Sequence, residues 1–214
     1  TAQGAMGRLL DADTDDLTLS PFMVYEIEDL INLGDKNLIP VLTYLFHRIE
    51  TSLDGTPTIL VLDEAWIMLG HSVFRAKIRE WLKVMRKANC AVILATQSLS
   101  DAKNSGILDV LAESCPTKIF LPNITATQEA QRELYVGMGL NKTQINIIAR
   151  ATPKRDYYVV SPLGRRQVQL ALGPRTLAFV GSSDKESVAR IQALEAEYGV
   201  NGWQYEWLRE RGAA

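Results

Sequence analysis

An unbroken apolar run that ends in two adjacent carboxylates constrains this chain more than any other feature. The run spans residues 58–62, and Asp63 and Glu64 follow it directly. A continuous run of this length is typical of a strand covered on both faces in a parallel sheet. Since α/β sheets bind ligands at the carboxyl ends of their strands, the two carboxylates are predicted to lie at a ligand-binding edge. The alternative is an ordinary strand end followed by a polar turn.

Strand-like and helix-like segments alternate before Pro122. Apolar runs of strand length are separated by segments whose apolar residues recur at helical spacing. This alternation predicts an α/β fold with a three-layer architecture and a mostly parallel sheet. The predicted strands are residues 22–27, 58–62, 91–95 and 117–121, and the predicted helices are residues 36–53 and 72–88.

The pattern changes after Pro122. Two short helices and a β-hairpin are predicted, followed by a helical end. Ser183 and Glu186 have the spacing of a capping box, and Gly199 ends the helix that they begin. We therefore expect a core over residues 1–181 and a helical appendage over residues 182–214. The predicted elements are helices at 127–138 and 142–150, hairpin strands at 156–160 and 166–170, and a final helix with Trp203, Tyr205 and Trp207.

Charge and cysteine content exclude several classes of protein. The formal net charge is −2 and the pI is about 5.8, so any contact with DNA would have to be local. Cys90 and Cys115 sit beside apolar runs, which indicates buried, reduced thiols in a cytosolic protein. His47 and His71 have no partners at metal-ligand spacing. No membrane span or signal peptide is evident, and the first residue, Thr1, favours a piece of a longer chain.

Asp63 and Glu64 match the Walker B element of P-loop NTPases. In that element the first carboxylate holds the water shell of Mg²⁺, and the second activates or orients the attacking water. Yet no G-x-x-x-x-G-K-[ST] sequence occurs in the 214 residues. The chain is therefore expected to carry the catalytic half of a nucleotide site and to lack the half that holds the phosphates.

Gln97 follows the next predicted strand. Neighbouring parallel strands would bring it close to Glu64, where its amide could bond a γ-phosphate or the attacking water as a sensor. The alternative is a Gln that caps a helix beginning near Ser100. The joint pattern of strand-Asp-Glu, helix and strand-Thr-Gln-Ser favours the sensor.

Arginines outside the strands are further candidates. Arg75, Arg79 and Lys83 form a basic stripe that we interpret as a solvated helix face. Arg86 is expected at the edge of the sheet that holds the carboxylates, where in a ring it could reach the γ-phosphate of a neighbouring subunit. Three arginines bracket the predicted hairpin and could bind phosphate, although a charged turn is nearly as good an interpretation. These are Arg155, Arg165 and Arg166.

Several motifs in order resemble the CagE/TrbE/VirB ATPases of bacterial type IV secretion and conjugation, above all the TrbE branch of that family. The resemblance covers nearly the whole chain and is more specific than a Walker B element alone. The motifs are Leu62-Asp63-Glu64-Ala65-Trp66, residues 78–83, residues 86–90, Ala95-Thr96-Gln97-Ser98, residues 113–123, residues 152–158 and residues 161–166.

This resemblance implies a RecA-like C-terminal motor domain that binds ATP and Mg²⁺ and couples ATP hydrolysis to pilus assembly and to transfer of DNA or protein. It assigns Asp63 and Glu64 to Walker B, with Asp63 holding Mg²⁺ through water, Gln97 to the sensor and Arg86 to an arginine finger acting in trans. It implies a hexamer or dimer in the cytoplasm, peripheral to the bacterial inner membrane. Its partners there would be other secretion components and a coupling protein. In the family the phosphate loop precedes this segment, so the chain alone is expected to be inactive.

Other classes of function remain as alternatives. A DEAD-type helicase is one, but Trp66 replaces the last Asp of that motif, and residues 95–97 replace its Ser-Ala-Thr. An ABC-type ATPase would need an L-S-G-G-Q sequence, which is missing. The alternative from another class is a non-catalytic docking module whose Trp-rich tail binds a partner.

Overall fold

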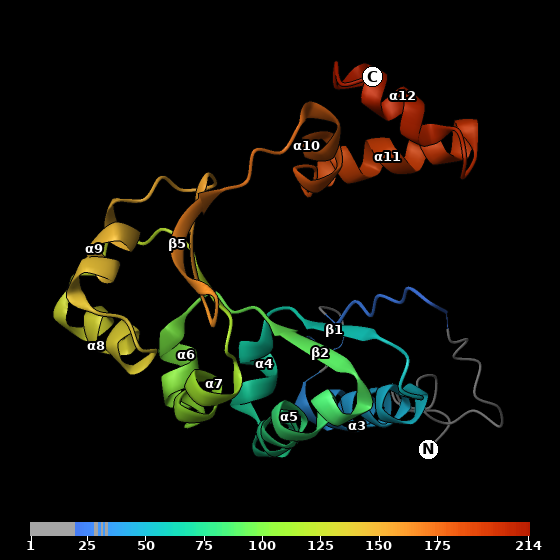
Figure 1. Ribbon diagram of the computed structural model, residues 1–214. Coiled ribbons are helices and arrows are strands. Elements are labelled where there is room, and N and C mark those ends of the chain that lie inside the picture. Colours follow the sequence, from blue (N-terminus) through green and yellow to red (C-terminus); the bar gives the residue numbers. More distant parts are fainter. Residues whose placement is uncertain (1–19, 28–29, 31, 33) are drawn as a thin grey trace. The chain divides into compact units, whose positions relative to one another are not determined.

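The computed structural model describes residues 20–27, 30, 32 and 34–214. The chain divides into two compact units, whose elements are labelled in Figure 1. The first unit comprises the described residues up to Pro116 together with Gln128–Asn141, and the second comprises Thr117–Thr127 and Lys142–Ala214. The domain boundary expected after residue 181 stays a prediction. No helix in the described part of the chain is both long and apolar enough to cross a membrane.

The first unit alternates helices with two strands, as the apolar pattern predicts. The helices expected at 36–53 and 72–88 and the strands expected at 58–62 and 91–95 are confirmed within one or two residues, except that the second helix ends in a 3-10 turn. The elements are α3 (Asp35–Ser52), β1 (Thr58–Leu62), α4 (Ala65–Gly70), α5 (Ser72–Val84), η1 (Met85–Ala88), β2 (Cys90–Leu94), α6 (Leu99–Asn104), α7 (Leu108–Ser114) and α8 (Glu129–Gly137).

Helices α3 and α5 supply most of the core under the sheet. Phe74, Ile78 and Trp81 recur at helical spacing on α5 and are almost completely buried. Phe46 of α3 lies between two of them, with ring centroids 5.4 Å from Phe74 and 4.5 Å from Trp81. At the end of α3, Glu50 accepts a hydrogen bond from the indole N–H of Trp81 at 2.6 Å, so the two helices are also joined by a polar contact.

Strands β1 and β2 pair in parallel, but one face of this small sheet is open. The register sets Thr58 opposite Cys90 and Leu62 opposite Leu94. On the open face Ile59 is 68% exposed and Val61 is 58% exposed. The prediction of a strand buried on both faces is therefore wrong for β1, because only one of its faces packs against the core of the described residues.

The strand expected at residues 22–27 is absent. These residues are irregular, since a strand exists only where a ladder of hydrogen bonds joins it to a neighbour, and β1 pairs with β2 alone among the described residues. Tyr25 and Ile27 pack against the core instead. The apolar composition of this segment is thus explained by packing and not by a sheet.

The second unit contains an antiparallel sheet of order β3-β4-β5. The predicted strand at 117–121 forms, but it pairs antiparallel with β4 and does not extend the parallel sheet. The hairpin is confirmed, with Ser161 opposite Gly164 at its turn. Gly164 has a φ of 133°, which only glycine adopts readily. The elements are β3 (Lys118–Phe120), α9 (Lys142–Arg150), β4 (Asp156–Ser161), β5 (Gly164–Gln169), α10 (Pro174–Val180), α11 (Lys185–Tyr198) and α12 (Trp203–Glu210).

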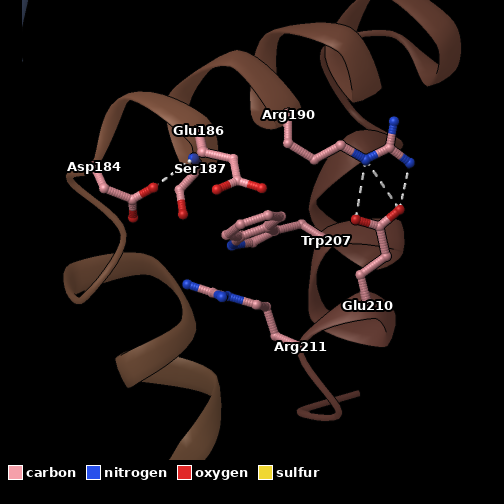
Figure 2. A pocket seen from close by; sticks show the side chains of 7 residues that line it. All are labelled: Asp184, Glu186, Ser187, Arg190, Trp207, Glu210 and Arg211. Carbon is pink, nitrogen blue, oxygen red and sulfur yellow. Dashed lines mark hydrogen bonds and ion pairs between the residues drawn. The ribbon is translucent and has the colours of Figure 1, made fainter.

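The three C-terminal helices α10, α11 and α12 are held together by polar and aromatic contacts (Figure 2). The indole N–H of Trp207 donates to the carbonyl of Ala178 on α10 at 2.8 Å. The capping box expected from Ser183 and Glu186 is wrong by one residue, because Asp184 is the N-cap of α11 and accepts from the backbone N–H of Ser187 at 2.8 Å. Asp and Ser cap equally well, so the sequence alone could not choose between neighbours.

Candidate functional site

The carboxyl edge of β1 and β2 brings two polar turns side by side. The parallel pairing continues one residue beyond β2, where the N–H of Ala95 donates to the carbonyl of Leu62 at 3.0 Å. Asp63 and Glu64 follow β1, and Gln97 lies shortly after β2. All three side chains are exposed at the edge where α/β sheets bind ligands.

Gln97 and Glu64 are in direct contact. The side-chain amide of Gln97 donates from Nε2 to Oε1 of Glu64 at 3.1 Å. The predicted proximity of these residues is therefore confirmed. Gln97 is not the helix cap of the alternative interpretation, because Ser98 is the N-cap of α6 and accepts from the N–H of Ser100. The amide of Gln97 is thereby available to meet the carboxylate.

The backbone at Glu64 is unusual. Its φ of 49° and ψ of 40° lie in the left-handed region, which non-glycine residues adopt rarely and often at functional sites. Glu64 also precedes α4, and its N–H donates to Oδ1 of Asp63 at 2.9 Å. This tight turn sets the two carboxylates at the start of α4. The sequence showed the carboxylate pair but not α4 or the strained turn.

Arg86 does not lie where the sequence suggested. It belongs to η1, which precedes β2, so it is near the amino ends of the strands. There the side chain of Asn89 donates to the carbonyl of Gly55, and the carbonyl of Asn89 accepts from the N–H of Thr58. At about 3.3 Å per residue, β2 separates this edge from the carboxylates by about 13 Å. The expected position beside the carboxylates of its own chain is wrong, because a parallel crossover enters each strand at the opposite edge.

The basic stripe on α5 is not simply solvated. Arg75 donates from Nη1 to the carbonyl of Ser105 at 2.7 Å, and Arg79 donates from Nη2 to the carbonyl of Gly106 at 2.9 Å. Both carbonyls follow α6, and Lys83, one turn further along α5, is exposed. Sequence reasoning missed these contacts, since their partners are backbone atoms about thirty residues away.

The hairpin arginines fall in the second unit. Arg165 lies opposite Val160 and Arg166 opposite Val159, so these two neighbours point to opposite faces of the sheet. Arg165 contacts the side-chain oxygen of Gln144 on α9 at 3.3 Å. Arg155 is exposed in the turn before β4. Their role in binding phosphate stays a prediction.

The C-terminal helices enclose a hollow lined by charged side chains, as Figure 2 shows. These groups already engage one another: Arg190 pairs with Glu210, and the guanidinium of Arg211 lies 4.7 Å from the ring centroid of Trp207. Trp207 itself is only 3% exposed. The tail therefore uses this tryptophan for packing, which removes the main support for a Trp-rich docking surface.

The donor set at the edge suits a hydrated magnesium ion. Mg²⁺ binds through one or two carboxylates and keeps several waters, and Asp63 and Glu64 supply two exposed carboxylates. In the described part of the chain, no three His, Cys, Asp or Glu side chains gather as a metal cage. The remaining ligands would have to be water and phosphate oxygens.

Comparison with known proteins decides the family. A model of the TraG P-loop domain matches residues 2–164. The chain belongs to the TraG P-loop domain family. Membership in a P-loop domain family confirms the α/β NTPase class that the strand and helix pattern predicted.

Relatives within this family confirm the resemblance to conjugation and secretion proteins. The chain is 61% identical over its whole length to the conjugal transfer protein TrbE of Rhizobium radiobacter. It is 62% identical over 99% of its length to a probable conjugal transfer protein TrbE of Sinorhizobium fredii. It spans only 26% and 32% of those two proteins.

A solved structure shows the same fold. VirB4 of Thermoanaerobacter pseudethanolicus matches with a TM-score of 0.58 and 21% identity, over 72% of this chain and 42% of that one. At this identity the likeness concerns the fold alone.

Proposed function

We propose that the chain is part of an ATP-hydrolysing motor that drives conjugal transfer or type IV secretion, coupling hydrolysis to pilus assembly and to transfer of DNA or protein. The observation that carries the proposal is the contact between Gln97 and Glu64, because it joins the two strand ends that a hydrolytic site requires. The high identity to two conjugal transfer proteins supports the biological setting.

Each side chain at the edge has a proposed role. Asp63 would hold Mg²⁺ through water, and the ion would neutralise charge on the phosphates. Glu64 would accept a proton from the attacking water or orient it, and this requires a carboxylate within hydrogen-bond reach. Gln97 would fix the orientation of the Glu64 carboxylate and offer its amide as a sensor. The exposure of all three leaves room for water and phosphate.

The fold proposal is a RecA-like, three-layer and mostly parallel sheet, with residues 182–214 as an appendage. Its support is the open apolar face of the sheet, where Ile59, Val61 and Ile93 are at least half exposed. Apolar side chains on the inner strands of a parallel sheet are normally covered by a second helical layer. Further elements of the motor would supply that layer.

The chain by itself is proposed to be inactive. None of its 214 residues form a G-x-x-x-x-G-K-[ST] sequence, whose backbone N–H groups and lysine hold the phosphates in P-loop enzymes. The full motor would combine that loop with the edge described above. We propose that it works as a hexamer or dimer in the cytoplasm, at the inner membrane, with other secretion components and a coupling protein as partners.

The arginines fit a role between subunits. Arg86 is exposed at the edge opposite the carboxylates, so its finger role requires the site of a neighbouring subunit. Arg155, Arg165 and Arg166 are exposed and would contact phosphate there or in the same subunit. Mixing Arg86→Ala subunits into wild-type assemblies should lower the rate more than in proportion to their share. A strictly proportional loss would contradict action in trans.

The proposed function is tested with Glu64→Gln in the native protein. The change removes the base but keeps the size of the side chain, so the rate of ATP hydrolysis should fall about 100- to 10,000-fold. Binding of a fluorescent ATP analogue with Mg²⁺ should persist.

The matched control is Glu113→Gln, which alters a carboxylate on α7 of the same unit, away from the carboxyl edge, and should leave the rate unchanged. A normal rate of ATP hydrolysis in Glu64→Gln would show that Glu64 does not act in hydrolysis.

A further inference from the structure

Two arginines of α5 reach across the first unit to the end of α6. The carbonyls of Ser105 and Gly106 accept from Arg75 and Arg79 at 2.7 and 2.9 Å. These residues follow α6 directly, and Gly106 has a φ of 70°, the left-handed turn that commonly ends a helix. Carbonyls at a helix C-terminus carry partial negative charge, so guanidinium groups stabilise them.

Helix α6 depends on its ends because it has only six residues. A helix so short is unstable by itself and keeps its place through tertiary contacts. Its first turn is capped by Ser98, which accepts from the N–H of Ser100 at 3.1 Å. Its last turn is held by the two arginines and by Ala102, which is almost completely buried. A shift at one end of such a short helix moves the other end.

The contacts close a circuit that begins and ends at the candidate site. Glu64 precedes α4, and α4 is joined to α5 through the single residue His71. From α5, Arg75 and Arg79 reach the end of α6. The start of α6 follows Gln97, whose amide returns to the carboxylate of Glu64. Every link is a short covalent connection or a hydrogen bond of 3.1 Å or less.

We propose that Arg75 and Arg79 are positioning residues that hold Gln97 in reach of Glu64. By fixing the C-terminal end of α6, the two guanidinium groups set the place of the turn that carries Gln97, and so the orientation of the Glu64 carboxylate. This inference rests on the proposed function of Glu64 and Gln97. It identifies a mechanical support on α5 that neither the Walker B pattern nor the sensor pattern contains.

Lys83 provides a control built into the same helix. It shares the face of Arg75 and Arg79 at i, i+4 spacing, and it is exposed. If charge on this face were the only cause of an effect, Lys83→Ala would reproduce it. If the grip on α6 is the cause, only the two arginines matter.

The first test measures hydrogen exchange in the native protein without nucleotide. In Arg75→Ala/Arg79→Ala, backbone amides of residues 99–106 should exchange about 10-fold faster, while those of α11 stay unchanged. Arg75→Lys/Arg79→Lys should restore part of the protection, because a lysine can still donate to one carbonyl. Lys83→Ala should match the wild type. Equal protection of residues 99–106 in the double variant and the wild type would overturn the proposal.

The second test is a cycle with Gln97→Ala, measured as ATP hydrolysis. Misplacing a catalytic group by about 1 Å can cost about 100-fold, so we expect the double arginine variant to lower kcat by about 10- to 100-fold with KM unchanged. In a Gln97→Ala background the same change should add little, since residues that act as a unit are not additive. Independent losses that multiply would show that the arginines act elsewhere.

The two tests separate this inference from the proposed function. If Glu64→Gln hydrolyses ATP normally, the proposed function fails, whereas the exchange result still reports on the grip of the arginines. If Glu64→Gln is inactive and the arginine variants keep full kcat, the positioning role alone is wrong. Should the double alanine variant not fold, the exposed single change Arg79→Ala and the lysine variants carry both measurements.

Discussion

The carboxyl edge of β1 and β2 and the C-terminal helices α10 to α12 are both rich in polar side chains, but they use them differently. At the edge, the exposed side chains of Gln97 and Glu64 meet through a hydrogen bond, and the backbone at Glu64 is held in the left-handed region. In the C-terminal helices, a buried tryptophan is flanked by an ion pair, a cap and a stacked guanidinium. The first arrangement leaves charge available to a ligand, whereas the second satisfies its charges internally.

This difference teaches where to look for function. Burial and mutual pairing, as around Trp207, indicate a contribution to stability. Exposed carboxylates on a strained turn contribute little to stability and persist for another reason. Variants in the two regions should therefore separate cleanly into stability effects and rate effects.

The largest effect should come from Trp207→Ala. Removing a buried tryptophan and its hydrogen bond to Ala178 should lower the free energy of unfolding of the C-terminal helices by about 3–5 kcal/mol. Urea unfolding followed by hydrogen exchange in residues 174–210 measures it. The control Tyr205→Ala, at a side chain 65% exposed on the same helix, should change stability by no more than about 0.5 kcal/mol. Equal losses in the two variants would break the comparison.

Gln97→Ala should show the opposite pattern. Its side chain is exposed, so the free energy of unfolding should change by no more than about 0.5 kcal/mol. The rate of ATP hydrolysis in the native protein should nevertheless fall about 10- to 100-fold, because the Glu64 carboxylate loses its partner. Gln128→Ala, at an exposed glutamine of the same unit, is the matched control and should leave both quantities unchanged. A large loss of stability in Gln97→Ala would make the edge structural.

The smallest effect concerns acid pH and Asp184. The hydrogen bond from the Ser187 N–H lowers the pKa of the Asp184 carboxyl, and nearby Arg211 acts in the same direction. A carboxyl whose pKa is lower in the folded state stabilises the fold fully above its ordinary pKa, about 3.9, and that contribution is lost as pH falls through the folded value.

Asp184→Asn should keep most stability at neutral pH, because Asn caps a helix as well as Asp does, and it should flatten the decline below about pH 4. Circular dichroism melts of the C-terminal helices between neutral and acid pH measure this. Glu186→Gln, in the first turn of the same helix, is the control. An unchanged pH profile in Asp184→Asn would show that this cap does not contribute to acid unfolding.

Much of the local structure could be read from the chain itself. The helices of the first unit and the hairpin follow from periodicity and turn residues, and the proximity of Gln97 to Glu64 follows from consecutive parallel strands. The errors arose where a partner decides the outcome. Residues 22–27 look like a strand but lack a ladder, and β3 pairs with a strand that comes about forty residues later.

The placement of Arg86 and the role of Arg75 and Arg79 were beyond sequence reasoning for a related reason. Periodicity shows which residues share a helix face, but it does not show what that face meets. Arg86 lies at the far edge because a crossover helix returns to the amino end of the next strand. Arg75 and Arg79 meet backbone carbonyls, which every residue possesses and which therefore leave no mark in the sequence.

The sequence by itself determined the carboxylate pair after β1, the glutamine after β2 and the α/β pattern around them. These depend on residue type and spacing, which act locally. Only the tertiary structure decided that Glu64 sits in a left-handed turn against Gln97, that the arginines of α5 contact the end of α6, and that Trp207 is packed and not presented to a partner. These outcomes depend on which distant segments meet, and the free energy of burial and pairing that selects those meetings is a property of the whole fold.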